Sequence, residues 1–204
     1  MNSHHTPQAT RELIEEHREA IRRLEREEAR QAGATRAPQG FYLVWHIVVG
    51  ITLGGLGALV SLAFNVIGAP IFGQPAMQLI RVYLTFPMGQ SALVAEEGLV
   101  LSVGAGLYLA TGAILGIFFH LLLRNHRDKG RARLFLMATA LGLGVWIVNF
   151  YLILSWLQPL LLGGRWIVDD IPIWVAALTH LAFAWTIWAG EVWGRVEPTL
   201  GEHR

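Results

Sequence analysis

Hydrophobic and polar positions divide the chain into a charged beginning and an apolar remainder. Residues 41–68, 98–123, 134–162 and 171–190 form four stretches that contain no Asp, Glu, Lys or Arg. Each stretch reaches the roughly 20 residues with which a helix crosses a bilayer, and in hydrocarbon a helix satisfies its own backbone groups. The pattern predicts an all-α integral membrane protein with four transmembrane helices, spanning about 41–68, 98–123, 134–162 and 171–193.

The first forty residues have the opposite character. They carry seven arginines and seven glutamates, and residues 10–31 contain neither Gly nor Pro. Neighbouring opposite charges favour a solvated cytoplasmic helix here. The alternative is a helix that docks on a partner or on the membrane surface through its thin apolar stripe, Leu13, Ile14, Ile21 and Leu24. Residues 32–40 then form a linker, so we expect a polar tail over 1–40, a transmembrane domain over 41–194 and a C-terminal tail over 195–204.

The distribution of basic residues predicts the orientation. With the N-terminus inside, the inner segments hold fourteen of the sixteen Lys and Arg residues, and the outer loops hold only Arg81 and Arg165. Such an imbalance favours an N-in/C-in topology. Aromatic residues suit the same arrangement, with Tyr42, Trp45 and Trp193 at the inner interface. We therefore expect a multi-pass protein of the bacterial inner membrane that contacts membrane lipids.

The first outer connection, residues 69–97, is long and partly apolar. Residues 76–86 predict a short helix between Pro75 and Pro87 that lies in the outer interface, where Arg81 reaches lipid headgroups. Such a helix serves either as a lid over the bundle or as a docking face for a partner subunit.

Composition excludes several kinds of chemistry. The chain has no cysteine, which excludes disulfides, thiolate zinc sites, iron–sulfur clusters and covalently attached haem. The formal net charge of +1 argues against a nucleic-acid-binding protein. No Walker A, HExxH or GxSxG motif is present, so no self-contained catalytic set is recognised.

Small residues recur at helical spacing within two of the spans. Glycines spaced three or four apart let two helices approach closely in a membrane. We expect the following residues to pack helices together, within the chain or against another protein: Gly50, Gly54, Gly57, Gly112 and Gly116.

Polar residues fall into two layers when depth is counted at about 1.5 Å per residue. Tyr108, Asn149 and His180 lie near the middle of their spans. Such groups either form interhelical hydrogen bonds or make a site for a quinone ring or a proton relay.

The second layer lies near the cytoplasmic ends, where His46, His120 and Glu191 share a similar depth. Two histidines on neighbouring helices suit the axial ligands of haem b, and with Glu191 they suit a metal ion. The plainer interpretation is that these side chains reach water from one turn inside the membrane.

Three functions remain open. The first is a non-catalytic accessory subunit that packs against other integral membrane subunits of a respiratory or photosynthetic electron-transfer complex. The second is a redox subunit that binds haem b or quinone through one of the two layers. The third is a small transporter, which is disfavoured because no interior of a span carries an ionised group.

Overall fold

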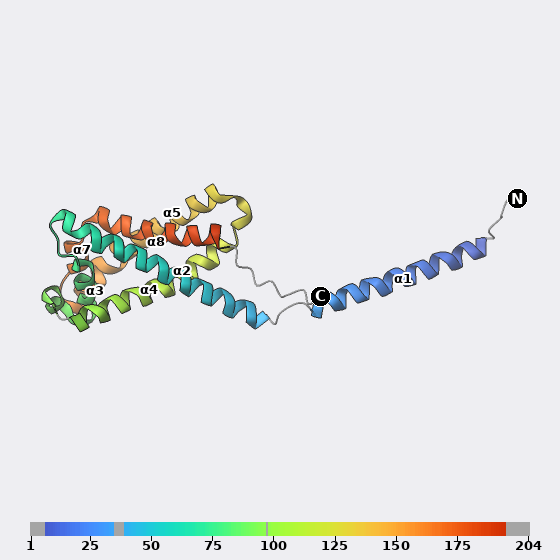
Figure 1. Cartoon of the computed structure of the whole chain (residues 1–204), viewed down its shortest axis with the longest axis horizontal. Coiled ribbons are helices and arrows are strands. Elements are labelled where there is room, and N and C mark those ends of the chain that lie inside the picture. The colour runs from blue at the N-terminus through green and yellow to red at the C-terminus, as the bar shows by residue number, and fades with distance from the viewer. Residues whose placement is uncertain (1–6, 35–38, 97, 195–204) are drawn as a thin grey trace. The chain divides into compact units, whose positions relative to one another are not determined.

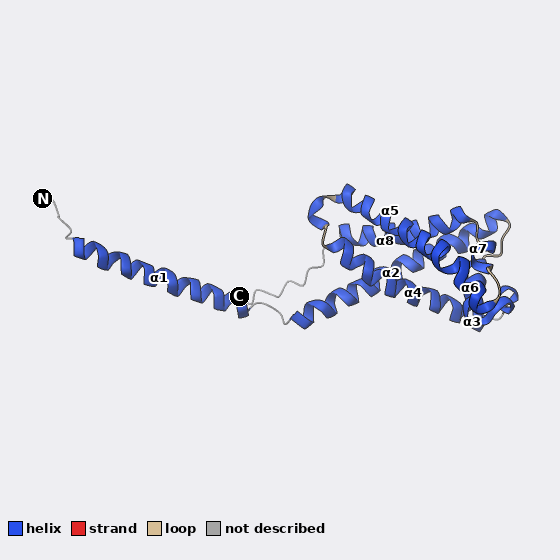
Figure 2. Ribbon diagram, turned by 180° about the vertical axis from the view of Figure 1, so that it is seen from behind, coloured by secondary structure: helices blue, strands red, loops and turns tan. Residues whose placement is uncertain are grey.

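A computed structural model describes residues 7–34, 39–96 and 98–194, and all secondary structure in these ranges is helical (Figures 1 and 2). The chain divides into two units, one of which holds α1 (Pro7–Ala34) and the other the helices from residue 43 onward. Helix α1 extends the predicted helix by three residues at each end. It leaves Ile14, Ile21 and Leu24 exposed, while the predicted tail over 195–204 lies outside the described residues.

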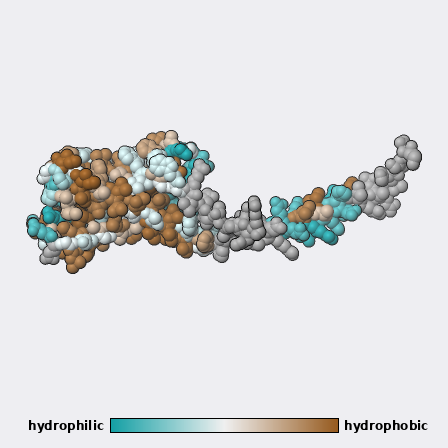
Figure 3. Space-filling view, in the orientation of Figure 1, coloured by the Kyte–Doolittle hydropathy of each residue, from teal (hydrophilic) through white to brown (hydrophobic). Residues whose placement is uncertain are grey.

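The second unit contains the four long apolar helices that the sequence predicts. They are α2 (Gln39–Gly68), α4 (Gly98–Arg124), the helical run over Arg131–Leu162, and α8 (Ile173–Trp193). Each is long and apolar enough to cross a membrane. Figure 1 shows α2, α4, α5 and α8 side by side along one direction, and Figure 3 shows apolar side chains covering much of the visible face of this bundle.

The third apolar helix changes its winding halfway along. It begins as α5 (Arg131–Ile147), becomes the π-helix η4 (Val148–Leu154), and ends as α6 (Ser155–Leu162). Pro159 in α6 lacks an N–H and cannot bond the preceding turn, which is a known cause of irregular helical winding. The π-helical turns widen the helix where Asn149 and Phe150 face the bundle.

Shorter helices gather at the end of the bundle where α2 ends and α4 begins. They are η1 (Ala69–Phe72), α3 (Gln78–Met88), η2 (Gly89–Val94) and α7 (Trp166–Asp170). The short helix predicted over 76–86 is α3, displaced by two residues. It buries Ile80, Val82, Leu84 and Thr85, so it is packed as a lid on the bundle.

Two hydrogen-bonded side chains hold this lid. Gln158 of α6 is fully buried; its amide donates to Thr85 Oγ1 at 2.7 Å, and its carbonyl accepts from the Ile167 amide at 3.1 Å. Arg81 donates from Nε to the Ala95 carbonyl at 2.9 Å. This guanidinium therefore caps a neighbouring turn through Nε, and the headgroup contact expected from the sequence stays a prediction.

The glycines predicted to pack helices do so within the chain. An added Cβ at Gly54 would lie 2.3 Å from the Gly112 carbonyl oxygen and 2.6 Å from Gly116 Cα, and one at Gly50 would lie 2.6 Å from Ile117 Cα. Gly57 faces the ring of Phe183. The glycine face of α2 is therefore occupied by α4 and α8, and is not free for another protein.

Candidate functional site

The three mid-span residues predicted to share a layer line one cavity. Tyr108 of α4, Asn149 of η4 and His180 of α8 all border a space of about 490 Å³, which we call the central cavity. Most of its wall is apolar, and α3 closes it from above with Leu79, Tyr83 and Phe86. The structure therefore brings these three residues to the wall of one cavity.

Two polar groups of the central cavity have unused hydrogen-bonding capacity. Asn149 makes no side-chain hydrogen bond with any described residue. His180 Nδ1 lies 2.8 Å from the Ala176 carbonyl, to which only an N–H can donate, so in the neutral ring Nε2 is an acceptor. The cavity thus offers one amide and one imidazole nitrogen to a ligand.

The other polar groups of the wall are already paired. Tyr108 shares a hydrogen bond of 2.9 Å with Ser61, and Tyr83 shares one with Thr111. Thr179 accepts from Asn65 Nδ2 at 2.8 Å. Sequence reasoning missed these partners, although the small polar residues Ser61 and Asn65 recur four positions apart inside the first span and mark a polar face of α2.

The central cavity opens sideways between α4 and η4. Leu107 and Thr111 of α4 and Ile153 of η4 are exposed lining residues, and these two elements are not packed closely against each other. The exposed apolar side chains at this mouth belong to the surface that the four long helices present to their surroundings. The central cavity therefore meets the apolar surface of the bundle at this mouth.

The second predicted layer forms a hydrogen-bonded chain that we call the histidine cluster: His46, His120, Arg127 and Glu191. His46 Nδ1 and His120 Nε2 are 3.1 Å apart, His120 Nδ1 pairs with Glu191 Oε1, and Arg127 Nε donates to Glu191 Oε2 at 2.7 Å. His120 and Glu191 are buried, at 1% and 2% exposure. These two side chains contact one another. The plainer interpretation of the sequence, in which each simply reaches water, does not describe them.

This arrangement favours a hydrogen-bonded chain over a metal site. The two axial imidazoles of a haem lie on opposite sides of the iron, so two bonds of roughly 2 Å place their nitrogens about 4 Å apart. The facing nitrogens of His46 and His120 are closer than that, and both oxygens of Glu191 are already engaged. Among the residues that the structure describes, no three His, Asp or Glu side chains are grouped to hold a metal ion.

The histidine cluster also changes one argument drawn from the sequence. The third candidate function, a small transporter, is disfavoured by the sequence because the interiors of the spans lack ionised groups. Glu191 is a buried carboxylate within the last apolar helix, where Arg127 and His120 compensate its charge. Arg127 comes from η3 (Arg127–Lys129), a connecting turn between two spans. Counting depth along the helices does not predict the contacts of such a turn.

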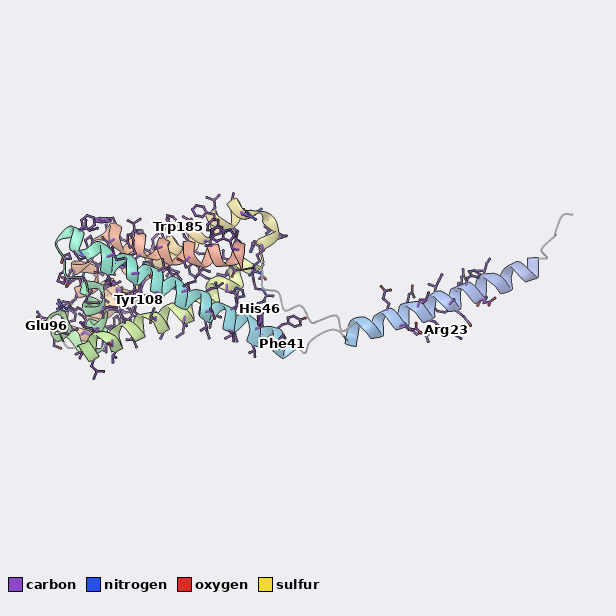
Figure 4. All side chains as sticks on the ribbon, in the orientation of Figure 1. Arg23, Phe41, His46, Glu96, Tyr108 and Trp185 are labelled. Carbon is purple, nitrogen blue, oxygen red and sulfur yellow. The ribbon has the colours of Figure 1, made fainter. Side chains whose placement is uncertain are left out.

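An apolar layer separates the central cavity from the histidine cluster. Phe183 lines the cavity and Phe119 precedes His120, and their rings pack edge to face with centroids 5.4 Å apart. Ala58, Ala184 and Ile187 complete this core. Figure 4 shows Tyr108 in the part of the bundle near α3 and His46 toward its other end. The two polar sites are therefore independent.

A smaller pocket of about 190 Å³ lies between the end of α2 and the connection to α8. Asn65, Trp174 and Asp170 are among its lining residues. Burial, and then the neighbouring Asp169, raise the pKa of Asp170 above its ordinary value. The pocket is too small to accommodate the ring and tail of a lipid-soluble cofactor, so the central cavity is the stronger candidate.

The chain was compared with protein-family models, curated proteins and solved structures, and none of them matches it.

Proposed function

We propose that this chain is a multi-pass membrane subunit whose central cavity binds a quinone-type ring, as part of an electron-transfer assembly. The observation that carries the proposal is the shared location of Tyr108, Asn149 and His180 on the wall of one apolar cavity. Ligand sites of this kind combine an apolar wall with a few polar groups that fix orientation.

The polar groups suit the oxygens of a quinone or quinol. The Asn149 amide donates to a carbonyl oxygen, and the neutral His180 ring accepts a hydroxyl proton at Nε2. Asn149 belongs to the π-helix, a form of winding that often occurs at functional sites. The lateral mouth between α4 and η4 suits a molecule that is delivered from the lipid.

Membrane insertion with both termini inside belongs to the same proposal. Four helices of the required length and apolarity support insertion, and the excess of Arg and Lys in the segments flanking them supports the N-in/C-in orientation. The bacterial inner membrane is the proposed location. In this orientation α3 and α7 cover the outer end of the bundle.

A second candidate is a purely structural accessory subunit. The exposed stripe on α1, with Ile14, Ile21 and Leu24, favours a protein contact outside the membrane. Under this hypothesis the central cavity holds only a lipid chain, and variants of its polar residues leave assembly with partner subunits unchanged.

The test is quinone binding by the purified full chain in lipid nanodiscs. A short-tailed ubiquinone analogue is titrated, and binding is followed by isothermal calorimetry. We expect saturable binding that weakens about tenfold in Asn149→Leu and in His180→Phe, since one lost hydrogen bond corresponds to roughly 1 kcal/mol or slightly more.

Ser102→Ala is the matched control, because Ser102 is exposed on α4, bonds only the Gly98 carbonyl and does not line the cavity. Its affinity should equal that of the unmodified chain. Absence of saturable binding, or equal affinity in all three variants, contradicts the quinone proposal and leaves the structural one.

A further inference from the structure

The end of the bundle where α2 begins and α4 ends carries unused hydrogen-bond donors. Arg124, the last residue of α4, is half-buried and makes no hydrogen bond or ion pair with any described residue. Arg127 uses Nε and one Nη on Glu191, which leaves its other Nη available. His46 uses only Nδ1, toward His120.

Positive charge is in excess at this place. The charged or titratable groups that act on His46 are Arg124 and His120 of α4, Arg127 of η3 and Glu191 of α8. Glu191 is the one acid among them, and its two oxygens are taken by His120 and Arg127. No carboxylate among the described residues therefore pairs with Arg124, which lies beside an apolar bundle where an unpaired charge is costly.

We propose that Arg124, Arg127 and His46 bind the phosphate group of an anionic phospholipid. Guanidinium groups match phosphate oxygens in geometry and charge. In a chain inserted as proposed above, Arg124 ends an apolar helix and therefore lies at the depth of the headgroups. Exposed Phe118 and Leu122 of the same helix supply apolar surface for an acyl chain.

The protonation state of His46 enters this site. Ionised Glu191 accepts a hydrogen bond from His120 Nδ1–H. In that neutral tautomer of His120, Nε2 accepts a hydrogen bond from His46 Nδ1–H. His46 then offers a donor at Nε2 only when it is protonated. Because the anion binds the protonated ring, affinity falls as rising pH removes the proton from His46.

The experiment measures lipid binding by the full chain in neutral detergent. Short-chain phosphatidylglycerol and phosphatidylcholine with identical acyl chains are titrated at pH 6 and pH 8, and bound lipid is counted by native mass spectrometry. We expect phosphatidylglycerol to bind about tenfold more tightly than phosphatidylcholine at pH 6, with a smaller preference at pH 8. Arg124→Gln and His46→Gln should each abolish most of the preference.

Arg133→Gln is the matched control, since it removes the same charge from an exposed position in the first turn of α5. It should keep the preference. An equal loss in Arg133→Gln indicates a diffuse charge effect and overturns the site. Inorganic phosphate is titrated in parallel; if it competes fully with phosphatidylglycerol at equal concentration, the site takes a free ion and the lipid assignment is wrong.

Two further measurements keep the outcomes distinct. Circular dichroism and gel filtration show whether Arg124→Gln and His46→Gln fold, and the latter keeps a polar side chain for this reason. Quinone titration of the same variants reports on the central cavity, which an apolar core separates from this site. Loss of lipid preference in variants that keep their fold supports the phosphate site whether or not the chain binds quinone.

Discussion

Gly54 lies where α2 and α4 come closest, and its missing side chain sets their separation. A Cβ at this position would overlap three backbone atoms of α4, which cannot move aside as a side-chain end does. Neighbouring Gly55 has open space around its Cα. Glycine spacing in the sequence identified the packing face of α2. Only the structure shows which helices cover that face.

Gly54→Ala should therefore destabilise the bundle by about 1 to 3 kcal/mol through overpacking. Gly55→Ala should be neutral or slightly stabilising, because alanine restricts the unfolded chain and meets no neighbour. Thermal unfolding in detergent, followed by circular dichroism, measures both. Equal melting temperatures for the two variants would show that the close approach of α2 and α4 is wrong.

At the scale of elements, buried polar side chains join helices that are distant in the sequence. Glu191 ties α8 to His120 of α4 and to Arg127 of η3, and Gln158 ties α6 to α3 and α7. Residue depth was predictable because α-helical rise is constant. The contacts of Arg127 and the π-helical winding were not, since they depend on how a turn folds back and on a proline several residues away.

Glu191→Gln should destabilise the chain by about 3 kcal/mol, the range expected when one partner of a buried pair is removed, lowered because Arg127 stays partly exposed. Asp169→Asn is the control, since its pair with Arg165 spans 3.6 Å at the surface and both side chains are more than half exposed. That variant should change stability by less than about 1 kcal/mol. The free energy of unfolding of both variants is measured by chemical unfolding in mixed micelles. Similar losses in the two would refute the buried pairing of Glu191 with His120 and Arg127.

At the scale of the whole molecule, the apolar pattern predicted the number and approximate limits of the long helices, because crossing hydrocarbon demands both length and lack of charge. The lid role of α3 was one of two interpretations of residues 76–86, and packing of Ile80 and Leu84 on the bundle supports it, while the docking of a partner on the other face of α3 stays a prediction. The cavity depends on side chains from seven elements, whose relative rotations no single-helix pattern specifies.

The absence of cysteine from the sequence gives a direct test of topology. Ser91→Cys and Lys129→Cys place single thiols at exposed positions in the two connections that flank α4. A membrane-impermeant maleimide applied to intact cells should label the first variant at once and the second only after permeabilisation. The reverse order of labelling would invert the proposed orientation.

The sideways opening of the central cavity determines how affinity has to be expressed. If the chain is inserted as we propose, a molecule entering between α4 and η4 comes from the bilayer, so occupancy follows the mole fraction of that molecule in the lipid and not its concentration in the buffer. Doubling the lipid at fixed protein and fixed total quinone should halve the mole fraction of quinone in the bilayer. The total quinone needed for half-saturation should therefore double. Dissociation constants from preparations with different lipid content become comparable only after that correction.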